Sequence, residues 1–194
     1  IKLLKLFKIC CLTMNDKTRR LSFGLPSLDI ENYIDGTIII KNIIQPDDWP
    51  NNIIEKLIFW AQKKPKKTFL AQRNKSLSWD KLSYEETLSK VKSLSYFLLK
   101  QGLSKNNPVI ILSGNDNNHA LLALSCLFSK IPFSALSPAH SLYSDNLNRL
   151  ENVKEILNPG FIFASNGNIF KNSILKFSLK PEKILVGKSP LPGN

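Results

Sequence analysis

The chain has 194 residues, a length that favours one domain, or part of a larger one, over two complete domains. Apolar residues make up 43% and charged residues 22%, a balance that allows a buried core and excludes disorder over most of the chain. No uncharged apolar run reaches the roughly 18 residues that a membrane-spanning helix needs. Cys10 and Cys11 are adjacent and Cys126 is isolated, which excludes a disulfide framework and fits a reducing, cytoplasmic location.

The formal net charge is +12, because 27 lysine and arginine residues face 15 acidic ones. A surplus of this size is typical of proteins that bind nucleic acid or anionic lipid. Only four of the 27 are arginines, however, and nucleic-acid-binding proteins favour arginine for its bidentate hydrogen bonding. We therefore predict no nucleic-acid partner. A basic peripheral protein that binds anionic lipid or RNA through its lysines remains an alternative.

Residues 1–13 mix apolar residues with lysines, which allows two interpretations. They could form a basic amphipathic anchor or a signal sequence, or they could be sequence upstream of the first methionine, Met14. The lysines interrupt the apolar stretch and no small-residue cleavage site follows, which favours the second interpretation. We predict that residues 1–20 are an extension, disordered or not native, and that the folded domain covers residues 21–194.

The first predicted elements are two strands within residues 28–40, around a turn at Asp35-Gly36. A helix is predicted to begin at residues 47–50 and to end in the lysine-rich segment 63–67. Its apolar positions have helical spacing: Ile53, Ile54, Leu57, Ile58 and Ala61. Two further short strands that pair with each other are predicted at residues 68–72 and 79–82.

Strands and helices alternate in the rest of the chain. Ser83 and Glu86 form a capping box that begins a helix, and Gly102 is suited to its end. The remaining strands are predicted at residues 108–112, 132–136, 161–164 and 184–186, with helices at 118–129 and 144–157, a loop at 137–141 and a turn at 166–167. This alternation with short loops predicts an α/β fold with a partial, doubly wound parallel sheet and flanking helices, preceded by short N-terminal strands.

In such a sheet, ligands bind beyond the carboxyl ends of the strands. Two loops are predicted there, Ser113–Asn117 and Ser137–His140. The first combines glycine, small polar side chains and a helix N-terminus, which could hold a phosphate or a carboxylate. The same residue types are the preferred caps of a helix, and on chemistry alone a capping turn is the favoured interpretation.

Several catalytic motifs are missing from the sequence. There is no G-x-G-x-x-G, and Gly187-Lys188-Ser189 fails as a P-loop because Glu182 stands where that motif has glycine. His119 and His140 have no cysteine or acidic partners at ligand spacing, so we predict no metal site. The apolar neighbours of His119 on its helix favour a packing role.

Segments in a fixed order resemble the N-terminal part of the AMP-forming acyl-CoA synthetases, and within them most of all the feruloyl-CoA synthases. The most specific are LSGN at 112–115, HALLAL at 119–124 and SPAHSL at 137–142, after DGTI at 35–38, FWAQ at 59–62, TFLAQR at 68–73, LSY at 82–84 and GLS at 102–104. The resemblance covers roughly residues 20–164. The sequence departs from the family at two positions. The family usually has an aromatic residue where His140 stands, and commonly glycine where Lys130 stands.

The resemblance implies an enzyme that uses ATP to convert a carboxylic acid, of the aromatic feruloyl type, into an acyl-adenylate and then transfers the acyl group to CoA. ATP, CoA and Mg²⁺ are expected for the complete enzyme, and no ligand is expected on this chain alone. The family's phosphate-binding loop and its C-terminal lysine have no counterpart here. We therefore expect a fragment that is truncated before that loop and is inactive by itself.

The resemblance assigns no catalytic residue. It places five positions near the ligand cleft: Ser113, Gly114, Asn115, His119 and Ser137. Truncation should leave an unpaired sheet edge and an apolar face without its covering layer, so we expect poor solubility or partial melting. The alternative is a self-contained, non-catalytic α/β module that binds a nucleotide or a protein partner.

Overall fold

The computed structural model describes residues 27–44, 51–142 and 147–188. The chain divides into two compact units, Ile1–Trp49 and Pro50–Asn194. The predicted extension at residues 1–20 and the helix start predicted at residues 47–50 lie outside the described residues. Each unit is considered by itself.

The first unit contains an antiparallel hairpin of β1 (Leu28–Asn32) and β2 (Ile38–Asn42), as predicted. Gly36 has a φ of +85° in the connecting turn, a conformation that glycine adopts without strain. The Asp35 carboxylate accepts a hydrogen bond from the backbone N–H of Thr37, which fixes the turn. The two strands are held by their antiparallel backbone pairing and this local turn, and none of their residues is buried.

The second unit begins with α2 (Ile53–Lys63), whose N-cap is Asn52. The Asn52 side chain accepts hydrogen bonds from two backbone N–H groups of the first turn. Ile54, Leu57 and Ala61 are buried as predicted. Ile53, predicted to lie on the same face, is 60% exposed because it is the first helical residue and sits at the edge of the apolar stripe.

An antiparallel pair follows, formed by β3 (Thr68–Arg73) and β4 (Trp79–Ser83). It leads directly into α3 (Tyr84–Lys100), where the predicted capping box is complete. The Ser83 hydroxyl accepts from the N–H of Glu86, and the Glu86 carboxylate accepts from the N–H of Ser83. The helix ends before Gly102, which has a φ of +75°.

Four parallel strands form the central sheet in the order β6-β5-β7-β8. Their bounds are Val109–Leu112 for β5, Phe133–Leu136 for β6, Phe161–Ala164 for β7 and Ile184–Val186 for β8. Every residue of β5 and β7 is buried, the pattern of parallel strands covered on both faces. This confirms the predicted α/β class and its parallel sheet.

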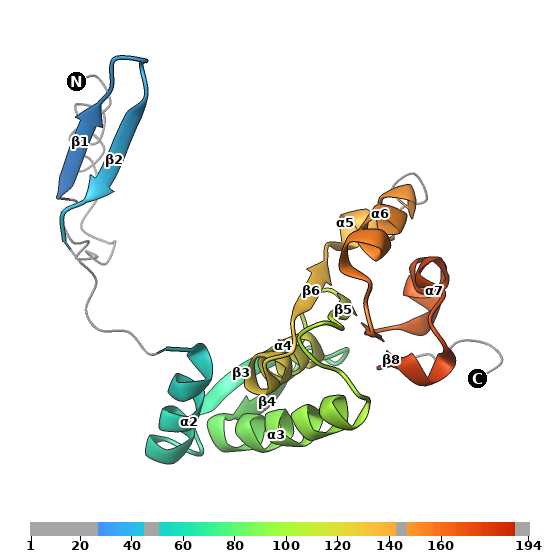
Figure 1. Ribbon diagram of the computed structural model, residues 1–194. Coiled ribbons are helices and arrows are strands. Elements are labelled where there is room, and N and C mark those ends of the chain that lie inside the picture. The colour runs from blue at the N-terminus through green and yellow to red at the C-terminus, as the bar shows by residue number, and fades with distance from the viewer. Residues whose placement is uncertain (1–26, 45–50, 143–146, 189–194) are drawn as a thin grey trace. The chain divides into compact units, whose positions relative to one another are not determined.

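Helices cover both faces of the two central strands (Figure 1). On one face, α3 and α4 (Asn117–Ser129) build a core with the sheet: Leu98, Val109, Ile111, Leu122, Cys126, Phe161 and Phe163. On the other face, α6 (Leu147–Leu157) and α7 (Gly167–Phe177) build a second core: Ile110, Leu112, Leu150, Ile162, Ala164, Phe170, Ile174 and Phe177. The expectation of an apolar face without cover is therefore wrong for β5 and β7.

Two segments differ from their predictions. The turn predicted at residues 166–167 is the start of α7, where Asn166 is the N-cap and its side chain accepts from the N–H of Ile169. The loop predicted after β6 contains α5 (Pro138–Ser141), a single turn capped by Ser137. In both cases a residue that favours turns also caps a helix, so the local signal is ambiguous.

Candidate functional site

The strands β5, β7 and β8 end together at one edge of the sheet. Their pairing sets Leu112 opposite Ala164 and Ala164 opposite Val186. The segments that follow are tied to this edge, because Ser165 N–H donates to Leu112 C=O and Gly187 N–H donates to Ala164 C=O, each at 2.9 Å. This carboxyl edge is where α/β sheets bind ligands.

Three predicted site residues meet directly after β5. Ser113 is buried, and its hydroxyl donates to the Gly114 carbonyl at 2.7 Å. His119 Nδ1 lies 3.0 Å from the Ser113 hydroxyl oxygen and 3.1 Å from the Gly114 carbonyl oxygen. A carbonyl only accepts, so the arrangement in which all three contacts are hydrogen bonds puts a proton on Nδ1. In the neutral ring, Nε2 is then the acceptor.

The N-terminus of α4 is held by side chains from two elements. Asp116 accepts from the backbone N–H of His119 at 2.9 Å. Gln72 of β3 accepts from the backbone N–H of Asn117 at 2.8 Å, and the Asn117 amide donates to the Asp80 carbonyl of β4. These two N–H groups are therefore satisfied within the protein, which is the capping interpretation of this loop.

A polar pocket of about 150 Å³ lies at the carboxyl edge. It is lined by residues from β3, the start of α4 and the segments after β7 and β8: Gln72, Asp116, Asn118, Ser165, Asn166 and Lys188. Lys188 contributes a positive charge. The N-terminus of α7, which carries the positive end of the helix dipole, also lies at this edge. The Asp116 carboxylate also belongs to this lining, which therefore suits a small polar group.

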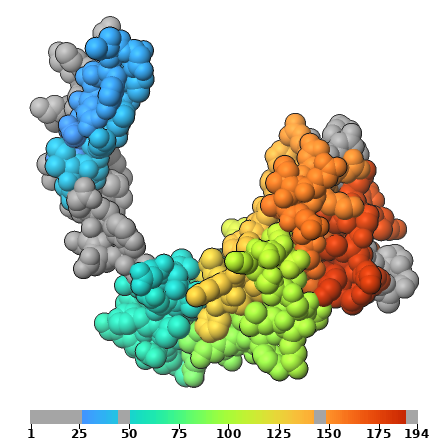
Figure 2. All heavy atoms as spheres, in the orientation of Figure 1, coloured from blue at the N-terminus to red at the C-terminus, as the bar shows by residue number. Residues whose placement is uncertain are grey.

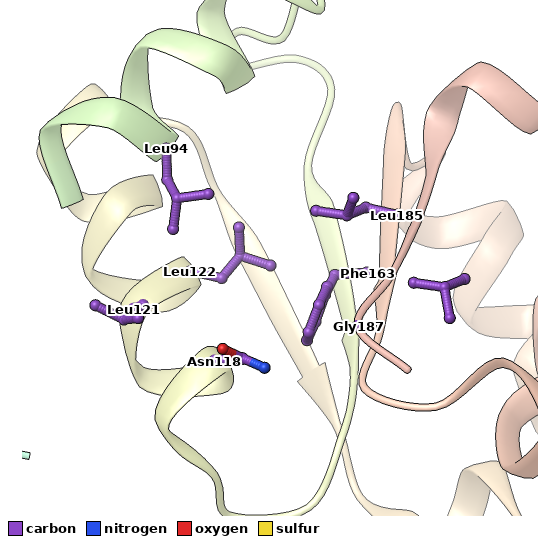
Figure 3. Close-up of a pocket in the computed structure, with 8 residues that line it drawn as sticks. Leu94, Asn118, Leu121, Leu122, Phe163, Leu185 and Gly187 are labelled. Carbon is purple, nitrogen blue, oxygen red and sulfur yellow. The ribbon is translucent and has the colours of Figure 1, made fainter. Parts of the chain in front are cut away.

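An apolar pocket of about 200 Å³ adjoins it. Figure 3 shows Leu94 of α3 and Leu122 of α4 facing Phe163 of β7 and Leu185 of β8. Asn118 lines both this pocket and the polar one. Together the two pockets offer room for a molecule with an apolar body and a polar end.

The other predicted site residues lie elsewhere at this end of the unit. Asn115 lines a third pocket of about 400 Å³ beside β3 and β4, together with Arg73 and Trp79. Ser137 follows β6 and caps α5, where its hydroxyl accepts from the N–H of Ala139. The structure thus brings Ser113, Gly114 and His119 together, whereas Ser137 serves a separate helix cap.

Five residues of the polar pocket were not predicted as site residues: Gln72, Asn118, Ser165, Asn166 and Lys188. Ser165, Asn166 and Lys188 lie within two residues of the ends of predicted parallel strands, so the rule that selected the Ser113 loop also points to them. Gln72 belongs to an antiparallel strand that reaches this edge only through tertiary packing, and no sequence signal marks it.

The second unit also contains a cysteine, Cys126, whose thiol is buried. Desolvation raises the pKa of the Cys126 thiol to about 12, so this thiol is neither a nucleophile nor a metal ligand at neutral pH. Across residues 27–44, 51–142 and 147–188, no three His, Cys, Asp or Glu side chains gather to hold a metal ion. The helices of these same ranges are all too short or too polar to cross a membrane.

Comparison with known proteins finds other structures with the same fold. No protein-family model and no curated protein matches the sequence. Solved structures do match. A fatty acyl-adenylate ligase from L. pneumophila, in complex with acyl adenylate and pyrophosphate, aligns with a TM-score of 0.54 and 18% identity over 69% of this chain. The chain therefore shares the fold of part of this ligase.

Two further neighbours share this fold. The luciferase-like enzyme of the nonluminescent mealworm Zophobas morio aligns with a TM-score of 0.56 and 18% identity over 72% of this chain. VinN, solved with L-aspartate, aligns with a TM-score of 0.57 and 13% identity over 68% of this chain. The chain covers 22% of the L. pneumophila ligase, 33% of the mealworm enzyme and 31% of VinN.

Proposed function

We propose that this chain is the N-terminal part of an acid–CoA ligase that works in the cytoplasm. In the first step the carboxylate attacks the α-phosphate of ATP, which forms an acyl-adenylate and releases pyrophosphate. In the second step the CoA thiol attacks the acyl carbon, which forms the thioester and releases AMP. The adenylate-forming fold supports the first step, and the resemblance to feruloyl-CoA synthases supports the second.

The observation that carries the proposal is the pair of pockets that share Asn118 at the carboxyl edge of this fold. The apolar pocket is lined by leucines and Phe163, which suits the ring of an aromatic acid. The polar pocket would receive the carboxylate, with Lys188 as the cation in its lining. We assign no Mg²⁺ ligands to the described residues, since they offer no acidic cluster.

The coding sequence downstream of Asn194 tests the class. We expect a Thr/Ser/Gly-rich loop ending in Pro-Lys, and we expect the longer product to release pyrophosphate from ATP with ferulate and to form a CoA thioester. The 194-residue chain should release none. A stop codon directly after Asn194, or pyrophosphate release by this chain alone, would contradict the proposal.

One substitution in that longer product tests the apolar pocket. Leu122→Trp fills the apolar pocket and should lower kcat/KM for aromatic acids by about tenfold or more, with little effect on a short aliphatic acid. Leu127→Trp is the matched control, since Leu127 lies on the same helix and is 45% exposed. Unchanged turnover in His119→Ala would remove His119 from the predicted cleft.

A non-catalytic binding module is the second candidate. It is favoured by the helices that cover both faces of β5 and β7, because a covered sheet needs no further layer at these strands. Titration calorimetry of the 194-residue chain with ATP separates the two. Micromolar binding, with no ligase activity in any longer product, would establish the module; failure to bind ATP would exclude a nucleotide-binding module.

A further inference from the structure

Four aromatic rings form a continuous row on the surface of the second unit, and Phe69 at one end of the row also lines the third pocket. Phe59 packs edge-on against Trp60 with ring centres 5.2 Å apart. Trp60 lies 6.2 Å from Tyr84, which stacks on Phe69 at 4.7 Å. Phe59 is 46% exposed and Phe69 is 38% exposed. The row joins α2, β3 and α3, and α2 forms part of the outer surface of this unit (Figure 2).

Lysines surround these rings. The Lys63 ammonium lies 5.2 Å from the Phe59 ring centre and 5.7 Å from that of Trp60. Lys56 lies 6.0 Å from Phe59, and Lys64 lies 5.5 Å from Trp60. The rings and the neighbouring lysines together are called the aromatic–lysine patch: Lys56, Phe59, Trp60, Lys63, Lys64, Lys66, Lys67, Phe69 and Tyr84.

The charge of the patch is positive after its acidic neighbours are counted. Lys66 forms an ion pair with Glu85 at 2.7 Å. Glu86 is engaged by the backbone N–H of Ser83, and Glu55 accepts from the Asn52 amide. Within the described part of the chain, the other four lysines of the patch form no ion pair. Five lysines against Glu55, Glu85 and Glu86 (5 − 3) leave the patch a net charge of +2 beside its exposed rings.

The side-chain types favour a lipid surface over RNA. At 100° per residue, the exposed flank of α2 carries Ile53, Lys56, Phe59, Trp60 and Lys63 in one arc. Aliphatic and aromatic groups flanked by lysines are typical of helices that lie at a membrane interface. RNA-binding surfaces use arginine and free ring faces, whereas this patch has no arginine and its central rings pack against each other.

We propose that the aromatic–lysine patch binds the surface of an anionic lipid bilayer. The lysines contact headgroup phosphates and carboxylates, and Ile53, Phe59 and Phe69 reach the boundary between headgroups and acyl chains. The patch shares no residue with the apolar and polar pockets, so this inference does not depend on the proposed ligase activity.

Vesicle co-sedimentation of the 194-residue chain tests the proposal. We expect binding to an equal mixture of phosphatidylcholine and phosphatidylserine, little binding to phosphatidylcholine alone, and binding that weakens, without being lost, as salt rises. Lys56→Glu/Lys63→Glu should weaken binding by about tenfold or more. Lys171→Glu/Lys180→Glu makes the same change in net charge on exposed lysines elsewhere and should weaken it by less than about threefold.

A third variant separates insertion from simple charge attraction. Phe59→Ala keeps every charge and should reduce the binding that persists at high salt. Far-UV circular dichroism checks that each variant is folded. Equal losses in the two lysine variants, no response to Phe59→Ala, or tighter binding to single-stranded RNA than to the mixed vesicles would each overturn the proposal.

Discussion

At the scale of single residues, Gly160 shows where the fold leaves no room for a side chain. It lies just before β7, and its N–H donates to the Pro108 carbonyl at 3.0 Å. A Cβ at this position would lie 2.7 Å from the Asn107 Cβ and 3.0 Å from a methyl carbon of Leu103. Gly114, in contrast, has open space where a Cβ would be. The two glycines therefore differ in what they do for the fold.

Replacing each glycine by alanine measures that difference. Gly160→Ala should lower the free energy of unfolding by about 1–3 kcal/mol, because Asn107 and Leu103 must move. Gly114→Ala should change it by less than about 0.5 kcal/mol. Urea denaturation followed by circular dichroism measures both. A similar loss in the two variants would show that the space at Gly160 is not limiting.

At the scale of elements, α7 covers one face of the sheet together with α6. Phe170, Ile174 and Phe177 recur at helical spacing and are all at least 97% buried against the sheet. Asn166-Gly167 is a common turn signal, but here Asn166 caps the helix and Gly167 is its first residue. The periodicity was present in the sequence, while the cap chemistry could be assigned only from the structure.

Truncation of one α7 side chain tests how much this cover contributes. Phe170→Ala should lower the free energy of unfolding by about 3–5 kcal/mol, because it opens a cavity in the core beside β5 and β7. Ile169→Ala is the matched control on the same helix, since Ile169 is 59% exposed, and it should cost less than about 1 kcal/mol. Equal unfolding midpoints for the two variants would contradict the packing of α7.

The capping box of α3 predicts a pH dependence. The hydrogen bond from the Ser83 backbone N–H is the largest cause that lowers the pKa of Glu86 below its ordinary value. A lowered folded-state pKa stabilises the protein above the ordinary glutamate pKa of about 4.3, and this contribution is lost as the pH falls through the lowered value.

Glu86→Gln keeps an acceptor oxygen but does not titrate. Its urea midpoint should therefore fall less steeply than that of the unsubstituted chain as the pH is lowered below about 4.5. Glu155→Gln, on the exposed face of α6, should leave the slope of the unsubstituted chain unchanged. Parallel slopes for all three proteins would show that the capping box does not contribute to acid sensitivity.

At the scale of the whole molecule, the three core clusters formed by the described residues all belong to the second unit. Two clusters lie on the faces of the parallel sheet. A third joins α2, α3 and α4 around Leu57, Val91 and Leu121. Because both faces of β5 and β7 are covered, we expect the second unit to fold cooperatively rather than to be partly molten.

Residues 50–194 produced alone should therefore unfold in a single transition. We expect a near-UV circular dichroism signal from fixed aromatic packing, and coincident urea transitions by fluorescence and far-UV circular dichroism. The urea midpoint should match that of the 194-residue chain. A missing near-UV signal, with secondary structure retained, would restore the expectation of a molten state.

Elements with a local cause could be predicted from the amino-acid sequence. The Ser83–Glu86 capping box, the turn at Gly36 and the apolar runs of β5 and β7 each specify their own conformation through nearby residues. The parallel α/β class followed from their alternation. Among the site residues, Ser113, Gly114 and His119 could be grouped because they lie within seven positions of one loop and helix start.

Which distant residues share a pocket depends on the packing of the folded chain. Gln72, Asn118 and Lys188 meet at one edge because an antiparallel pair, a helix and the last strand converge there. It also decided that α7 closes one face and that four rings from three elements form one surface row. These contacts depend on how the chain packs over long sequence separations, and local periodicity carries no information about that.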